Sequence, residues 1–190
     1  VFLILHIEDN EHAGALYYIV AEFGMIAVTT VIGFVFWRSL AAQFKRLGFF
    51  RVEAWIGVAA LVPLLAINFG MQELFELLLG AEGESLKDYF RGLGFGRLGM
   101  VLMIAVVPAV TEEIAFRGLV QHWMNVAVGS RKAILYASLL FTALHFNPLA
   151  APYLLAVGLV LGWVKNKTGS LYPSMTIHFI HNLAVLELFG

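Results

Sequence analysis

The 190-residue chain contains no cysteine and only two aspartates, Asp9 and Asp88. The absence of cysteine excludes a thiol nucleophile, a disulfide framework and thiolate ligands for a metal, and it leaves the redox compartment open. Aspartyl proteolysis within a membrane needs two embedded aspartates, and both aspartates of this chain lie outside its long apolar runs. None of the six histidines is followed by glutamate, so the HExxH zinc motif is absent as well.

Charged residues are scarce and apolar residues abundant. Only 13% of the residues are charged and 61% are hydrophobic, and the mean hydropathy is +0.85. Soluble domains have about 25% charged and about 45–50% apolar residues. The net charge of −1 carries no sign of a nucleic-acid-binding surface. The composition therefore predicts an all-α integral membrane protein with the lipid bilayer as its surroundings and no nucleic acid as a partner.

Six apolar runs approach or exceed the length of about 20 residues that a membrane helix needs. They are residues 15–37, 54–79, 96–128, 132–147, 149–164 and 171–189. Basic residues follow the first, third and fifth runs, which places those three connections on the cytoplasmic side by the positive-inside rule. We therefore expect a multi-pass transmembrane bundle of about six helices in one domain, residues 1–190, located in the cell membrane if the source is prokaryotic. Because the chain begins with Val1 rather than Met, we also expect a processed or partial chain.

The lengths of the later runs predict two irregular features. The run 96–128 is too long for one upright helix, so we expect a break or an interfacial segment after Gly118. With upright helices Glu112 would lie far from His178 in depth, and such a break would bring them closer. The two short runs that follow share a turn at Asn147-Pro148, which we expect to lie within the membrane.

The segment TEEIAFRG, residues 111–118, places two carboxylates and an arginine inside an apolar run. Ionisable groups at membrane depth cost several kcal/mol unless they are paired or hydrated. Glu113 and Arg117 are spaced i, i+4 with the acid first, which favours an ion pair on one helix face. Glu112 is rotated from that face by about 100° and follows Pro108, which disrupts the helix. We therefore expect Glu112 to face a hydrated cavity.

Polar residues of the last three runs are candidates to share that cavity. His145 ends the sequence FTALH, and TIHFIHN places His178 and Asn182 at i, i+4 on one face of the last run, with His181 pointing away. Desolvation favours a meeting of these groups with Glu112 around one pocket. The chemistry that remains is a carboxylate base, assisted by imidazole, acting on a water molecule.

Three motifs in this chain resemble those of a known family. TEEIAFRG is similar to the EExxxR motif, FTALH to the FxxxH motif and HFIHN to the HxxxN motif of the CPBP family. These are the CAAX protease and bacteriocin-processing membrane proteins, also called the Abi family of glutamic intramembrane endopeptidases. Each motif alone is a weak signal, but all three occur in the family's order on successive apolar runs. The resemblance covers about residues 96–189, the motif-bearing core.

The resemblance implies a catalytic set drawn from three apolar runs, namely Glu112, His145, His178 and Asn182. The first two would deprotonate the attacking water, and the last two would donate hydrogen bonds to the oxyanion of the tetrahedral intermediate. Glu113 and Arg117 would form a supporting ion pair. The substrate would be a membrane-associated protein or peptide, prenylated or leader-bearing, and no metal or other cofactor is implied.

Two other functions are left open by the residues alone. A glutamate with two histidines is a plausible zinc set, which would make a zinc-dependent membrane protease, although Asn182 is a poor zinc ligand. A non-enzymatic scaffold or a proton-coupled transporter would use Glu112 and the histidines as a proton relay, although no internal repeat typical of transporters is evident. Glu22 is a further acid at membrane depth without an evident partner. The natural substrate and the oligomeric state do not follow from the sequence.

Overall fold

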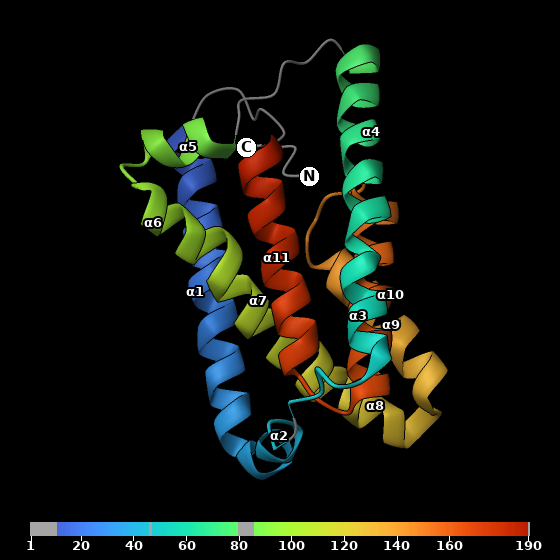
Figure 1. The fold of residues 1–190 in the computed structure, drawn as a ribbon. Helices are drawn as coiled ribbons and strands as arrows, with labels where there is room; N and C mark the ends of the chain where they lie inside the picture. Colours follow the sequence, from blue (N-terminus) through green and yellow to red (C-terminus); the bar gives the residue numbers. More distant parts are fainter. Residues whose placement is uncertain (1–10, 46, 80–85, 190) are drawn as a thin grey trace.

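The computed structural model describes residues 11–45, 47–79 and 86–189, which form helices and turns with no strand among them (Figure 1). In chain order the helical segments are α1 (Glu11–Val35), α2 (Trp37–Gln43), α3 (Val52–Ala59), α4 (Leu61–Leu79), α5 (Leu86–Gly92), α6 (Arg97–Met100), η1 (Val101–Val106), α7 (Val107–Glu112), η2 (Glu113–Val120), α8 (Gln121–Val128), α9 (Ser130–Ala143), α10 (Ala151–Thr168) and α11 (Tyr172–Phe189). The all-α fold class expected from the sequence is confirmed.

Helices occupy all six apolar runs, but they differ in their suitability as membrane spans. Two are long and apolar enough to cross a membrane, Val52–Leu74 and Arg97–Val128. The pair Phe23–Val35 and Trp37–Gln43, bent by 95°, adds a third if it counts as one span. No other helix of the described residues combines the required length and apolarity. The structure is therefore that of a helical protein able to span a membrane, and the expected number of six spans stays a prediction.

The motif TEEIAFRG lies in one continuous helix, Arg97–Val128, composed of α6, η1, α7, η2 and α8. The break expected after Gly118 is not there, and that position was wrong: the backbone remains helical to Val128, and the chain turns at Gly129, where φ is 82°. Two π-helical segments, η1 and η2, accommodate the irregularity instead. They retain backbone hydrogen bonds, for example from Gln121 N–H to the Phe116 carbonyl, whereas a break would leave polar groups unpaired in apolar surroundings.

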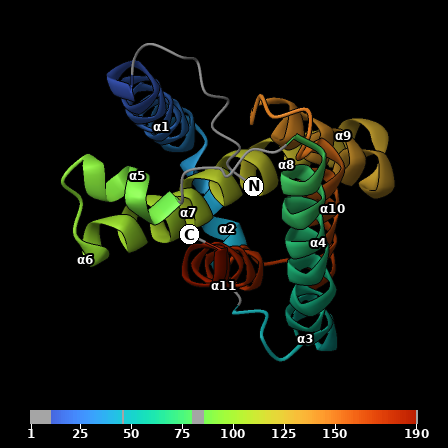
Figure 2. The same cartoon turned by 90° about the horizontal axis from the view of Figure 1, so that it is seen from above.

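The slant of this long helix removes the need for a break near Glu112. Figure 1 shows it crossing behind α11 at an angle, and the view from above places it between α1 and α11 (Figure 2). Depth along an upright helix is therefore a poor guide to which residues are neighbours.

The turn between α9 and α10 lies about midway along α4 rather than at an end of the molecule (Figure 1). Its backbone is stabilised locally, because the Asn147 Oδ1 accepts a hydrogen bond of 3.0 Å from the Ala150 N–H. Phe146 adopts a left-handed conformation with φ of 48°, which is uncommon for a bulky residue. That this turn lies within the membrane stays a prediction.

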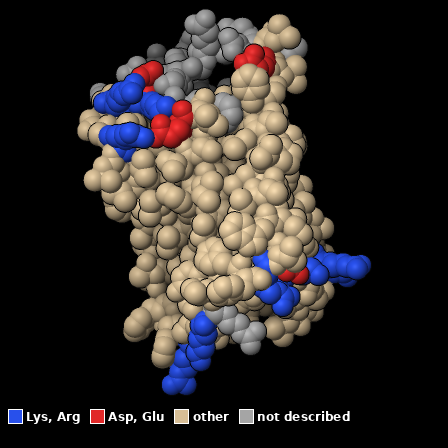
Figure 3. Space-filling model, in the orientation of Figure 1, with Lys and Arg blue, Asp and Glu red and all other residues tan. Residues whose placement is uncertain are grey.

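Charged side chains gather at the two ends of the face shown in Figure 3, with a broad uncharged band between them. The upper end carries both signs, including ion pairs between Arg91 and Asp88 and between Arg97 and Glu187. The lower end is mainly basic and lies beside α2 and the start of α3. This asymmetry agrees with the cytoplasmic side expected from the basic connections.

Close contact fixes α2 and the start of α11 against the motif helix. The Gln43 Nε2 donates to the Gly118 carbonyl at 2.8 Å, and the Gln43 carbonyl accepts from the Leu171 N–H at 3.3 Å. A Cβ at Gly118 would lie 2.8 Å from Leu40 Cδ2 and 3.2 Å from Leu171 Cδ1. Glycine at this position therefore lets both neighbours approach the helix that carries the acidic motif.

Candidate active site

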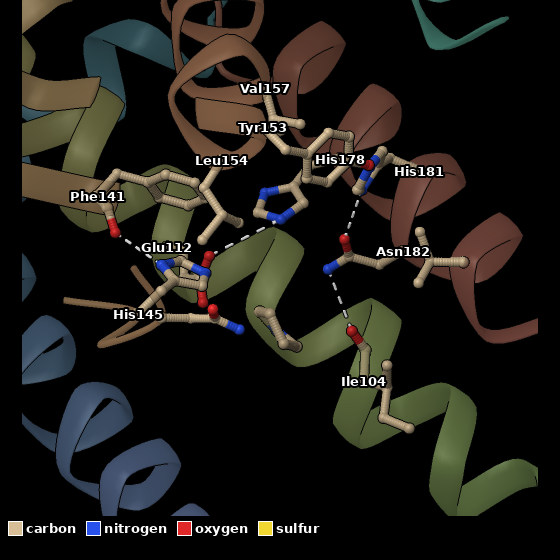
Figure 4. A pocket seen from close by; sticks show the side chains of 13 residues that line it. Ile104, Glu112, Phe141, His145, Tyr153, Leu154, Val157, His178, His181 and Asn182 are labelled. Atoms are coloured by element: carbon tan, nitrogen blue, oxygen red, sulfur yellow. Dashed lines mark hydrogen bonds and ion pairs between the residues drawn. The ribbon is translucent and has the colours of Figure 1, made fainter. Parts of the chain in front are cut away.

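The four residues expected to be catalytic line one cavity of about 90 Å³, at the meeting point of the motif helix, the end of α9, α10 and α11 (Figure 4). One water molecule needs roughly 10–15 Å³ of such volume, so the cavity has room for several. Its lining consists of Glu112, His145, His178 and Asn182 together with Ile104, Pro108, Phe141, Asn147, Tyr153, Leu154, Val157, His181 and Val185.

Glu112 comes to the cavity from the end of α7. Its side chain is 13% exposed, and its Oε2 lies 3.8 Å from the Nε2 of His178. Direct hydrogen bonds to nitrogen are about 2.7–3.2 Å long, so this gap suits a bridging water or a substrate oxygen. Glu112 thus faces a cavity and a histidine rather than Arg117, as the helical spacing indicated.

Glu113 and Arg117 form the ion pair expected from their spacing. The Arg117 Nη1 lies 3.0 Å from the Glu113 Oε1, and both side chains are almost completely buried. The guanidinium also lies 4.6 Å from the centroid of the Phe141 ring and donates from Nη2 to the Gly158 carbonyl at 3.3 Å. The pair therefore ties the motif helix to α9 and α10.

His178 connects this buried pair to the cavity. Its Nδ1 lies 3.1 Å from the Glu113 Oε1. A carboxylate paired with Arg117 is an acceptor only, so the histidine nitrogen carries the hydrogen. The other nitrogen, Nε2, faces Glu112 as an acceptor when the ring is neutral and as a donor when the ring is an imidazolium.

His145 enters the cavity from the end of α9. Its Nδ1 lies 2.6 Å from the Phe141 carbonyl, which can only accept, so Nδ1 carries the hydrogen. A neutral His145 then presents the lone pair of Nε2 as its remaining polar group. The ring is held further by the Phe141 ring, whose centroid is 4.4 Å from that of His145.

Asn182 is held by two hydrogen bonds within the described structure. Its Nδ2 donates to the Ile104 carbonyl at 3.2 Å, and its Oδ1 accepts from the Nδ1 of His181 at 2.8 Å. His181 in turn contacts the hydroxyl of Tyr153 through Nε2. Neither His181 nor Tyr153 is expected at the site from the sequence. His181 is the second histidine of HFIHN, and this polar residue beside Asn182 was a usable signal. Nothing in the sequence near Tyr153 distinguishes that tyrosine from a core residue.

Two glycines of α10 also contact the motif helix, and the sequence expectations do not include them. Gly158 and Gly162 are four residues apart, and their carbonyls accept hydrogen bonds from the side chains of Arg117 and Gln121 respectively. Small residues at this spacing let helices approach closely in membranes. The pattern GLVLG in the printed sequence was the available signal.

Two further points raised by the sequence are the acid Glu22 and a zinc site. The side chain of Glu22, in α1, lies outside the described part of the structure. Among the described residues, no group of three or more His, Asp or Glu side chains is arranged to hold a metal ion.

Comparison with known proteins gives a consistent picture of the second half of the chain. Residues 94–184 match the family described as type II CAAX prenyl endopeptidase, Rce1-like. The uncharacterized protein YpbD of Bacillus subtilis is 28% identical over 130 residues, which make up 66% of this chain and 63% of that relative. The aligned segment thus covers less than two thirds of the relative. No solved structure matches.

Proposed function

We propose, from the premise that this chain belongs through residues 94–184 to the Rce1-like family of CAAX endopeptidases, that it is an intramembrane endopeptidase. It hydrolyses a peptide bond of a membrane-associated protein or peptide, prenylated or leader-bearing, by means of a water activated by glutamate and histidine. The observation that carries the proposal is the convergence of Glu112, His145, His178 and Asn182 on one cavity between helices.

Glu112 and His145 activate the attacking water. The Glu112 carboxylate is a proton acceptor beside space large enough for water. The Nδ1–H of His145 is directed to the Phe141 carbonyl, which leaves Nε2 able to accept a hydrogen bond from the same water. Two acceptors on one water orient its remaining lone pair toward a substrate carbonyl, and general base catalysis of this kind contributes about 10²–10⁴-fold.

Asn182 and His178 stabilise the oxyanion that forms next. Asn182 donates one Nδ2 hydrogen to the Ile104 carbonyl and has a second for the substrate. His178 donates from Nε2 in its imidazolium form, because its Nδ1–H is already directed to Glu113. In other enzymes the loss of one such donor costs about 10²–10³-fold in rate.

Glu112 takes up a proton from the water and later returns it to the leaving group. The water gives one proton to this carboxylate as its oxygen bonds to the carbonyl carbon. When the tetrahedral intermediate collapses and the carbon–nitrogen bond breaks, the same proton passes to the leaving nitrogen. The products are a carboxylic acid and an amine, and the carboxylate is regenerated.

A Glu112→Gln variant tests the base assignment. The amide has the size of the carboxylate but accepts no proton, so we expect purified protein in bilayers to lose at least about 10²-fold in peptide cleavage while its unfolding transition is kept. Glu73→Gln, an exposed position of α4, is the matched control and is expected to retain full activity. Undiminished cleavage by Glu112→Gln would remove Glu112 from the mechanism.

The same preparation distinguishes the zinc-dependent and non-enzymatic alternatives. Stoichiometric zinc together with loss of cleavage on chelation would favour a metalloprotease. A proton flux that depends on Glu112, without any cleavage, would favour a transporter. We expect cleavage that is unaffected by chelators.

A further inference from the structure

A chain of three hydrogen bonds runs along the wall of the cavity, from Tyr153 through His181 and Asn182 to the Ile104 carbonyl (Figure 4). The Tyr153 hydroxyl, on α10, contacts the Nε2 of His181 on α11. The Nδ1 of His181 lies 2.8 Å from the Asn182 Oδ1, and the Asn182 Nδ2 lies 3.2 Å from the Ile104 carbonyl on η1. Tyr153 and His181 are buried, with 2% and 6% of their surface exposed.

The Ile104 carbonyl fixes the direction of every bond in this chain. It belongs to the π-helical segment η1 of the motif helix and lies 3.2 Å from the Asn182 Nδ2. A carbonyl can only accept, so the Asn182 amide must turn its Nδ2 toward it. Its Oδ1 then faces His181, the His181 Nδ1 must carry a hydrogen, and Nε2 is left to accept from the Tyr153 hydroxyl.

This direction excludes His181 as the base that activates water. Both of its ring nitrogens are occupied, one as a donor to Asn182 and the other as an acceptor from Tyr153. His181 therefore acts through its neighbour. A reversed Asn182 amide would place its oxygen against the Ile104 carbonyl oxygen, a repulsive contact that neither tautomer of His181 removes.

We propose that Tyr153 and His181 are positioning residues, which hold the Asn182 amide in the one orientation that directs its second Nδ2 hydrogen into the cavity. Within the described structure that hydrogen has no other partner, and Asn182 lines the cavity. The inference rests on the proposed function, in which this hydrogen is donated to the oxyanion. It also ties the activity of Asn182 on α11 to a backbone carbonyl of the motif helix and to a tyrosine on α10.

A double-mutant cycle measures whether Tyr153 acts through Asn182. Tyr153→Phe removes only the hydroxyl and keeps the ring in the core, so we expect kcat to fall about 3- to 10-fold, the usual worth of one hydrogen bond, with KM nearly unchanged. In an Asn182→Ala background the same change should have no further effect on kcat. An equal loss in both backgrounds would overturn the proposal. The matched control is Tyr172→Phe. The Tyr172 ring packs on Phe44 outside the cavity lining, so removal of its hydroxyl should leave kcat unchanged.

A second measurement is independent of catalysis. Nitrogen-15 NMR of the full chain in detergent, labelled at histidine, should show a neutral His181 with hydrogen on Nδ1, assigned by the loss of its signals in His181→Gln. Tyr153→Phe should shift the signal of the His181 Nε2, because the change removes the hydroxyl that donates to this nitrogen. Hydrogen on Nε2, or on both nitrogens, would contradict the direction of the chain even if the protein is a protease. If the predicted signals appear but no peptide is cleaved, the hydrogen-bond chain stands and the proposed function fails.

Discussion

Among the individual residues, Glu113 and Arg117 carry the greatest cost of burial. Two charges with almost no exposed surface are tolerated only when each offsets the desolvation of the other. Here the carboxylate also accepts from His178, and the guanidinium also donates to Gly158 and lies on the Phe141 ring. The pair therefore holds His178 in place as well as joining two helices.

Glu113→Gln should unfold far more easily than the unsubstituted protein. The change leaves the Arg117 guanidinium buried without a counter-ion, which typically costs about 3–5 kcal/mol. Denaturant titration in detergent measures the loss. Adding Arg117→Met to the same variant should restore part of the stability, because no unpaired charge remains. If the double variant is less stable than Glu113→Gln alone, the ion pair is not the source of the loss.

Helix α10 shows how one element positions groups on its neighbours. A Cβ at Gly158 would lie 3.0 Å from the Cβ and 3.2 Å from the Cα of Ser138 on α9. The absence of that Cβ lets the two helices approach closely, and the buried carbonyl of Gly158 accepts from Arg117. Backbone proximity, not side-chain chemistry, is what this position contributes.

Gly158→Val should separate α9 from α10 and weaken the bond to Arg117. Overpacking of this kind costs about 1–3 kcal/mol, and we expect the unfolding midpoint and the cleavage rate to fall together. Gly70→Val is the matched control, since nothing lies within 4 Å of a Cβ at Gly70 on α4. A Gly158→Val protein as stable as the Gly70→Val protein would show that α9 and α10 do not need this contact.

For the whole molecule, the distribution of charge sets an orientation in the bilayer. The end near α2 and α3 is mainly basic, and the end near α5 and α6 carries both signs (Figure 3). By the positive-inside rule we predict that the basic end is cytoplasmic.

Single-cysteine variants can test this orientation, because the chain has no cysteine of its own. In sealed cells a thiol reagent that cannot cross the membrane should label Asp88→Cys from outside and Lys167→Cys only after lysis. Ala137→Cys, a buried position with 2% exposure, should resist the reagent in both cases. Labelling of Asp88→Cys and Lys167→Cys from the same side would contradict the orientation.

The sequence alone determined the helical class, the ion pair within TEEIAFRG and the apolar surroundings of its acids. Those features depend on local spacing and on composition, since residues four apart share a helix face wherever the helix lies. The choice of Glu112, His145, His178 and Asn182 as a set also came from the sequence, through the order of three motifs.

Only the tertiary structure decided how these residues meet. The long motif helix slants past α11 instead of breaking after Gly118, and two π-helical segments preserve its backbone hydrogen bonds. Tyr153 is joined to Asn182 through His181 only because α10, α11 and η1 pack together, and Gly158 matters only because α9 lies against it. Spacing along one chain segment fixes which side chains share a face, but contacts between distant segments depend on the angles and depths at which helices pack.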